Sequence, residues 1–397
     1  MFESDDNMNK KISLGLAISL VAIASAVTFI LTSFFSLQSY NKKVVDVNEK
    51  AKKYNSLQHL DSFVREHYNG DIDEKDLNNG ILKGYVSGLG DKFSEYLSQD
   101  EYLDEQTVNA GEQIGLGLTL TEDSSGYILI ENVLEDSPAA ESGLVSGDVI
   151  TSVAGIDVKE TGFDEAMEAM KGSEGSTVEL TVRHNGVDTS YTFTRRSIEV
   201  VSVTGTLVDG YIGYIKIDGF KQNTPEQFVE TLQRLTSNGA EALLFDVRDT
   251  SEGVIDSVQE CLDPLLPEGI IATAEYKDGH TETIVYSDES AIKLPMAVLV
   301  NKNTSNVAEL FAAALKDVNN AQLIGIKTSG NGSLQEITDF ENGGAVKLTV
   351  AEIKTASEKS YNKVGLSPDV VVENENENVD SQYNKAIENL TLTLNGQ

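Results

Sequence analysis

The sequence predicts a multidomain protein of mixed helix and strand content, of the α/β (α+β multidomain) class, preceded by an apolar segment. Three observations support this expectation. Residues 12–37 carry no charged side chain, and residues 111–196 show short alternating strand patterns separated by Gly-rich turns. Residues 296–315 are typical of a buried strand, a polar turn and a helix, the unit that builds layered α/β domains. The 397 residues suffice for two or three domains.

The composition excludes several classes of function. The chain carries 30 basic and 64 acidic side chains, a net charge of −34, so nucleic acid is not an expected partner. Its single cysteine, Cys261, cannot form an intrachain disulfide. The four histidines are scattered without metal-ligand spacing. We therefore expect no metal site and no cofactor.

The N-terminal part is expected to anchor the chain in a membrane. A short polar tail, residues 1–11, precedes the charge-free run of residues 12–37, and about 20 apolar residues cross a bilayer. A cleaved signal peptide is the alternative, with small residues at Ala22, Ala24 and Ala26. Because these lie in the middle of the apolar run, a retained transmembrane anchor is favoured.

Lysines flank the apolar run on both sides, so charge alone leaves its orientation open. Lys10 and Lys11 would hold the N-terminus inside the cell. The connector, residues 38–56, carries more lysines and would favour the opposite orientation. These lysines are Lys42, Lys43, Lys50, Lys52 and Lys53.

Residues 57–110 are expected to form a helical region. Leu60, Phe63, Val64 and His67 recur at the spacing of one helical face. A second helix is expected to begin in the acidic run at residues 73–76.

Residues 111–196 predict a small β-rich module. The run Gly115, Leu116, Gly117 and Leu118 is a loop whose glycines let backbone N–H groups approach an anion. A later helix carries an apolar face that could wall a groove or pack in the core. That face consists of Phe163, Ala166, Met167 and Met170.

Residues 197–372 predict the α/β core. Residues 242–248 form a buried strand that leads into a polar turn. The strand at residues 296–300 leads through a second turn to a helix, where Asn306 and Glu309 have the spacing of a capping box. Residues 373–397 form an acidic linker and a terminal helix.

These segments together resemble the C-terminal processing peptidases, or tail-specific proteases, which are serine proteases with a Ser-Lys pair and a PDZ domain. Their nucleophile segment reads Val-Asn-Glu-Gly-Ser-Ala-Ser-Ala-Ser-Glu. Residues 300–309 here read Val-Asn-Lys-Asn-Thr-Ser-Asn-Val-Ala-Glu, which places the nucleophile position at Asn306. Their base segment, Gly-x-Lys-Thr-x-Gly-Lys-Gly-x-x-Gln, aligns with residues 325–335. The catalytic lysine then falls on Asn331, and the assisting glutamine is kept as Gln335.

A third family segment, Asp-Leu-Arg-Asn-Asn-Pro-Gly-Gly, aligns with residues 246–253 and supplies an oxyanion N–H in the family. Here it reads Asp-Val-Arg-Asp-Thr-Ser-Glu-Gly. Gly253 is kept, whereas Ser251 and Glu252 replace the family's proline and first glycine. A carboxylate beside this turn would repel the charge that an oxyanion site stabilises.

The resemblance implies a PDZ domain at residues 111–196 and a protease-like α/β sandwich core at residues 197–372. It also implies that protein or peptide C-terminal tails bind at the loop of Gly115 to Leu118, beside Phe163, Met167 and Met170. Members of the family usually act outside the cytoplasm. We therefore expect a single-pass membrane protein with an extracytoplasmic working part.

The sequence thus favours a binding scaffold that has lost proteolysis, a pseudoprotease that could act with or against an active protease relative. Asparagine at both reacting positions is the basis for this hypothesis. The alternative is a working serine endopeptidase with a relocated Ser-Lys pair, which needs a base within hydrogen-bond reach of the serine. The residues available for such a pair are Ser305, Ser329, Ser333 and Lys327.

Overall fold

The computed structural model describes residues 54–288, 291–374 and 379–396, with a few isolated positions before residue 54. It divides into two compact units, Met1–Leu77 and Asn78–Gln397. In the first unit, residues 54–67 are helical, and Arg65 of this segment forms ion pairs with Asp61 and Glu74. Helix α2, Glu74–Ser87, starts at the end of the first unit.

The expected membrane anchor is contradicted. Among the residues that the structure describes, none belongs to a helix that is both long and apolar enough to span a bilayer. The predicted anchor at residues 12–37, the tail before it and most of the connector fall outside the described residues. A charge-free run meets the compositional requirement for a span, but a span also needs a continuous helix of about 20 residues. The described residues provide no such helix, so the predicted single-pass membrane localisation is wrong on this finding.

The second unit begins within α2 and continues with the short strand β1, Glu95–Leu97, and helix α3, Gln99–Ala110. Helix α3 has a complete capping box: the Ser98 hydroxyl accepts from the N–H of Glu101, and the Glu101 carboxylate accepts from the N–H of Ser98. It ends at Gly111, whose left-handed conformation favours glycine. The helical region predicted from sequence is thus interrupted by a strand.

A small module follows α3, built on one antiparallel sheet of order β3-β4-β5-β7-β8. Its core contains alternate strand residues such as Ile128, Ile130 and Leu180, all fully buried. The strands are β2 (Glu112–Gly115), β3 (Leu118–Glu122), β4 (Ile128–Val133), β5 (Val149–Val153), β6 (Ile156–Asp157), β7 (Thr177–His184), β8 (Val187–Thr194) and β9 (Arg196–Glu199). The helices are α4 (Pro138–Glu141), α5 (Val158–Thr161) and α6 (Phe163–Met170).

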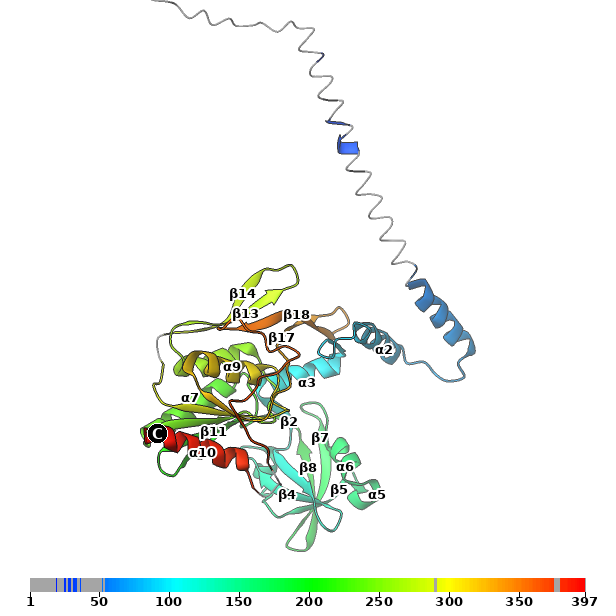
Figure 1. Cartoon of the computed structure of the whole chain (residues 1–397). Coiled ribbons are helices and arrows are strands. Elements are labelled where there is room, and N and C mark those ends of the chain that lie inside the picture. Colours follow the sequence, from blue (N-terminus) through cyan, green and yellow to red (C-terminus); the bar gives the residue numbers. More distant parts are fainter. Residues whose placement is uncertain are drawn as a thin grey trace, which may run out of the picture. The chain divides into compact units, whose positions relative to one another are not determined.

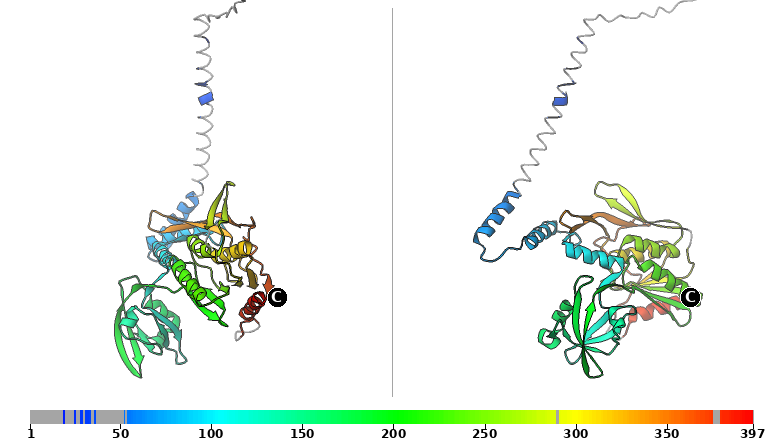
Figure 2. Two further views of the ribbon diagram at one scale, coloured as in Figure 1. Left: turned by 90° about the vertical axis from the view of Figure 1, so that its left-hand side faces the viewer. Right: turned by 180° about the vertical axis from the view of Figure 1, so that it is seen from behind.

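The larger domain is built on a six-stranded sheet of order β10-β11-β12-β15-β16-β19, parallel except for the β10–β11 pair. Helices α7, α8 and α9 pack on one face, and α10 packs on the other (Figures 1 and 2). Because both faces are covered, central strands such as β15 are apolar throughout. The strands are β10 (Val203–Val208), β11 (Ile212–Ile217), β12 (Ala242–Asp246), β15 (Met296–Val300), β16 (Gln322–Gly325) and β19 (Val370–Val371). The helices are α7 (Thr224–Ser237), α8 (Ile255–Leu262), the 3₁₀ turn η1 (Asp263–Leu265), α9 (Val307–Asn319) and α10 (Ser381–Leu394).

A separate antiparallel sheet of order β1-β18-β13-β14, with β17 paired to β18, completes the second unit. Strand β1, from the N-terminal side of α3, pairs with residues more than 240 positions later, Glu95 lying opposite Lys347. The other strands are β13 (Gly269–Tyr276), β14 (Thr281–Ser287), β17 (Ser333–Asp339) and β18 (Ala345–Thr355).

An ion network joins the parallel sheet to its C-terminal helix. The guanidinium of Arg248 contacts Asp246 at 2.6 Å and Asp380 at 2.7 Å, and Tyr214 donates to Asp246 at 2.9 Å. Asp380 also caps α10 by accepting from the N–H of Tyr383. Since the Asp246 side chain is only 2% exposed, its charge depends on Arg248 for compensation.

We predict that Arg248→Ala lowers the free energy of unfolding by about 3 kcal/mol, because it leaves the Asp246 carboxylate buried without its cation. Lys385→Ala is the matched control, since it removes an exposed pair with Glu388 and should cost under about 0.5 kcal/mol. Urea denaturation of the full chain measures both values. Equal losses in the two variants would contradict this account of the network.

Candidate functional site

The turn between β15 and α9 is fixed by its own polar side chains. The Asn301 side-chain oxygen accepts from the N–H groups of Asn303 at 3.0 Å and Thr304 at 3.1 Å. The buried Thr304 hydroxyl donates to the carbonyl of Val247 at 2.9 Å. The turn after β15 is therefore tied to the end of the neighbouring strand β12.

Asn306 occupies a strained position at the start of α9. Its φ of 51° and ψ of −119° lie outside the favoured regions for a residue with a side chain. Such a conformation costs about 1–3 kcal/mol and is characteristic of functional sites. The expected helix cap is absent, because the Asn306 side chain makes no capping hydrogen bond. The sharp elbow instead presents this side chain at the wall of a pocket.

Glu309 of α9 binds the loop after β16 as well as the start of its own helix. Its carboxylate is fully buried and accepts from the Thr328 hydroxyl and from the N–H groups of Gly330 at 2.8 Å and Asn331 at 2.7 Å. Burial raises the pKa of Glu309, while these bonds and one from the N–H of Asn306 oppose that rise. The side chain therefore holds the loop after β16 more than it caps α9.

Asn331, which the sequence comparison predicts at the family's lysine position, is buried in that loop and is 4% exposed. Its side-chain oxygen accepts from the Ser333 hydroxyl at 2.7 Å. Ser333 in turn accepts from the side-chain N–H of Gln335 at 2.8 Å. A chain of neutral hydrogen bonds thus runs from Gln335 through Ser333 to Asn331.

Gly253 lies in the turn that follows β12 and has a φ of 137°. A Cβ at this position would lie 2.3 Å from the carbonyl oxygen of Phe220, so only glycine fits. The bridge to Phe220 uses the carbonyl of Glu252 and the N–H of Val254, which leaves the N–H of Gly253 outside it. The Glu252 carboxylate is 60% exposed and lies 3.7 Å from the ammonium of Lys221.

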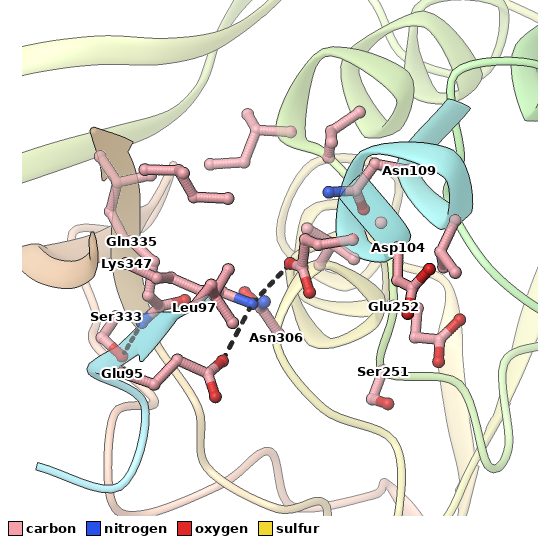
Figure 3. Close-up of a pocket in the computed structure, with 18 of the residues that line it drawn as sticks. Glu95, Leu97, Asp104, Asn109, Ser251, Glu252, Asn306, Ser333, Gln335 and Lys347 are labelled. Carbon is pink, nitrogen blue, oxygen red and sulfur yellow. Dashed lines mark hydrogen bonds and ion pairs between the residues drawn. The ribbon is translucent and has the colours of Figure 1, made fainter. Parts of the chain in front are cut away.

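One pocket of about 690 Å³ brings three of the four predicted catalytic positions together: Asn306, Gly253 and Gln335. Asn331 does not line it, but it is one hydrogen bond away through Ser333. Figure 3 shows Ser333 and Gln335 across the pocket from Asp104, with Asn306 between them.

The structure separates the members of the suggested relocated pair. Lys327 and Ser329 are exposed, and neither they nor Ser305 line the pocket. Ser333 does line it, but its proton is directed to the amide oxygen of Asn331. An amide oxygen is not a base that could activate a serine.

The sequence did not reveal a charged cluster in this pocket. Lys347 of β18 forms ion pairs with Glu105 of α3 at 2.7 Å and Glu95 of β1 at 3.7 Å. These residues lie about 240 positions apart in the chain, and only the register of β1 against β18 brings them together. No local pattern could have indicated their proximity.

The predicted peptide groove of the small module has a free strand edge. Within the described part of the chain, β3 pairs only with β4, so its other edge can accept an extended peptide. Phe163, Met167 and Met170 of α6 are partly buried against the same core. Leu118 is also partly buried, whereas Leu116 is 4% exposed and acts as a core residue.

Gly117 has a structural role as well. Its φ is 77°, and a Cβ there would lie 2.2 Å from the Cβ of Ser137. By contrast, a Cβ at Gly115 would meet nothing within 4 Å. Of the two glycines in this loop, only Gly117 is therefore required by packing.

Family models match two parts of the chain. Residues 211–372 match peptidase family S41, and residues 105–183 match the PDZ domain. The carboxy-terminal processing protease CtpA of Bacillus subtilis is 30% identical over 370 residues, which cover 92% of this chain and 78% of that protein. The carboxyl-terminal-processing protease of Synechocystis is 30% identical over 299 residues, covering 74% of this chain and 70% of that protein.

Two solved structures are similar to this chain, and the first of them shares its fold. A candidate S41 protease from Bacteroides fragilis aligns with a TM-score of 0.53 at 19% identity, covering 82% of this chain and 92% of that one. The photosystem II D1 C-terminal processing protease aligns with a TM-score of 0.48 at 25% identity, covering 78% and 85%.

We predict that Gly117→Ala destabilises the small module by about 2 kcal/mol or more, because the new methyl group meets Ser137 and the positive φ is strained. Gly115→Ala is the matched control and should change stability by less than about 0.5 kcal/mol. Urea denaturation, followed by hydrogen exchange of the module's backbone amides, measures the two effects. If both variants are equally stable, the close approach of residue 117 to Ser137 does not determine the stability of the module.

Proposed function

Because this chain belongs to the C-terminal processing proteases of peptidase family S41, we propose that it binds protein C-terminal tails without hydrolysing them. The observation that carries the proposal is the pair of asparagines, Asn306 and Asn331, at the nucleophile and base positions. An amide side chain offers neither a nucleophilic oxygen nor a basic nitrogen. Acyl transfer from a peptide to residue 306 therefore has no chemical route.

The neighbouring hydroxyl groups support the same proposal. Ser333 donates its proton to Asn331 and accepts one from Gln335, so both hydrogen bonds hold it in a neutral network. A nucleophilic serine needs a base in the place of Asn331. Lys347 is paired with the carboxylates of Glu95 and Glu105, and no hydrogen bond joins it to Ser333 in the described part of the chain.

Tail binding is assigned to the PDZ domain. The free edge of β3 can pair with an extended chain, and the loop at Gly115 to Leu118 can offer N–H groups to a terminal carboxylate. A protein with this domain and an unreactive pocket would suit the role of an adaptor for an active protease relative, or of its competitor for tails.

We predict that the purified full-length chain does not cleave an unstructured protein ending in apolar residues. Loss of both reacting groups removes orders of magnitude in rate, so products should not exceed those of a buffer control in mass spectrometry. Cleavage that disappears in Ser305→Ala or in Ser333→Ala would overturn the proposal and establish a relocated nucleophile.

The same assay can test how the site lost its chemistry. Asn306→Ser with Asn331→Lys restores the pair, and Ser251→Pro with Glu252→Gly restores the family's turn. We expect the quadruple variant to exceed the double variant by about tenfold or more, since one oxyanion donor alone is worth about 10²–10³ in rate. Equal rates of the double and quadruple variants would show that the Glu252 turn does not hinder the reaction. The nearby ammonium of Lys221 would then be the reason, because it offsets the charge of Glu252.

We predict that a peptide with an apolar C-terminal tail binds at least tenfold more tightly than its C-terminal amide, because amidation removes the charge that the loop N–H groups receive. The affinity should be modest, since a short extended peptide buries little surface. Titration calorimetry with the full chain gives both dissociation constants. Gly117 variants are unsuitable here because they disturb packing, so the comparison is made through the peptide. Indistinguishable constants would rule out carboxylate capture.

A further inference from the structure

The pocket at Asn306 has a free strand edge of its own. Strand β17 pairs with β18 on one side, and within the described residues no strand pairs with its other side. Ser333, Leu334, Gln335 and Ile337 of β17 line the pocket. An edge strand in a pocket offers unpaired N–H and C=O groups to an extended chain.

Helix α3 forms the opposite wall and presents a charged face. The residues that it contributes are spaced at i, i+3, i+4 and i+7, which places them on one side of the helix. They are Glu101, Asp104, Glu105 and Val108, followed by Asn109. The acidic side of α3 therefore lies across the pocket from β17 (Figure 3).

The charges that line the pocket are strongly unequal: five carboxylates face it against a single ammonium group, that of Lys347. The carboxylates are Glu95, Glu101, Asp104, Glu105 and Glu252. Lys83 pairs with Glu101 at 2.6 Å, and Lys221 lies 3.7 Å from Glu252. Asp104 is exposed and has no ion pair or hydrogen bond in the described part of the chain.

We propose that this pocket takes an extended peptide segment with basic side chains, which adds to the edge of β17 and directs lysine or arginine toward α3. Three observations converge on this occupant: the free edge selects an extended backbone, the volume of about 690 Å³ suits a ligand, and the acidic wall selects positive charge. The proposal rests on the proposed function, because a bound segment must persist uncleaved. It adds a second recognition element, distinct from the C-terminus that the PDZ domain would read.

The test uses the full chain and acetylated, amidated peptides of about ten residues, which lack the free carboxylate that the PDZ domain would read. Alternation of Thr with Lys places every lysine on one face of a strand. Matched peptides carry Gln or Glu in place of Lys. We expect the Lys peptide to bind about tenfold more tightly than the Gln peptide at low ionic strength, and the Glu peptide to bind most weakly. The differences should narrow at about 0.5 M salt.

Paired variants separate the pocket from the net charge of −34, which attracts any cation. Asp104→Asn should weaken binding of the Lys peptide about threefold, and Asp104→Lys about tenfold. Glu230→Gln on α7 makes the same change of charge at an exposed site away from the pocket and should leave binding unchanged. Equal effects of Asp104→Asn and Glu230→Gln would overturn the proposal in favour of non-specific attraction.

Backbone methylation tests strand addition. Two versions of the Lys peptide carry N-methyl groups on either its odd or its even residues. Because a strand directs alternate N–H groups to opposite sides, one version should lose at least tenfold in affinity and the other should not. Equal affinities of both versions would overturn addition to β17.

Two measurements on the same samples keep this proposal separate from the proposed function. Mass spectrometry reports whether the peptides are cleaved, and an apolar tail with a free carboxylate reports on the PDZ domain. If the apolar tail with a free carboxylate binds but the Lys peptide binds no more tightly than the Gln peptide, only the pocket proposal is contradicted. Cleavage of the Lys peptide defeats the proposed function while leaving the charge preference measurable.

Discussion

The buried carboxylate of Glu309 is the interaction on which the architecture of the pocket depends. It joins helix α9 to the loop after β16 through three hydrogen bonds, from Thr328, Gly330 and Asn331. Thr328 also accepts from the N–H of Leu366 at 2.7 Å, which brings the segment before β19 into the same arrangement. Each of these donors is essential to a carboxylate that is fully buried and whose pKa burial raises.

This arrangement explains how the site can keep its shape without its reacting groups. Glu309 contacts residue 331 through the backbone N–H, so the side chain at that position does not affect the bond. The elbow at Asn306 is similarly held by neighbours: Thr304 donates to Val247, and the N–H of Ser305 donates to the carbonyl of Thr250. Shape is therefore encoded by residues other than those that would perform chemistry. On the proposal made above, asparagine at these two positions removes reactivity and leaves the scaffold in place.

Much of the fold could be predicted from sequence because its elements have local patterns. The apolar run of β15 and the helical spacing of α9 both appear where expected, and so does the strand-rich module after Gly111. The pairing of β1 with β18 could not be predicted, because it joins segments about 240 residues apart. The cluster around Lys347 follows from that register and was missed for the same reason.

Motif spacing predicted residues that line one pocket, but it did not predict which hydrogen bonds their side chains make. Asn306, Gly253 and Gln335 converge on one pocket, as a shared site requires. The capping box expected from Asn306 and Glu309 is incomplete, because the Asn306 side chain makes no capping hydrogen bond at its unusual backbone angles, and the Glu309 carboxylate also binds the loop after β16. A local capping rule cannot anticipate a partner that arrives from a distant segment. The membrane anchor is a different case: residues 12–37 fall outside the described residues, and no described helix is long and apolar enough to span a bilayer.

Helix α3 connects the pocket at Asn306 with the PDZ domain. Its acidic face lines the pocket, and its C-terminal cap, Gly111, begins the PDZ domain. Asn223 of the larger domain donates to the carbonyls of Gly111 and Val200, both at 3.1 Å, where the chain enters and leaves that domain. A Cβ at Gly111 would overlap the Asn223 side chain, so the path of the chain at this junction is narrowly defined. Binding requires this geometry, the free strand edges and the charges, whereas hydrolysis requires two further side chains. On our proposal, the asparagines replace only the two side chains needed for hydrolysis and leave the features used for binding in place.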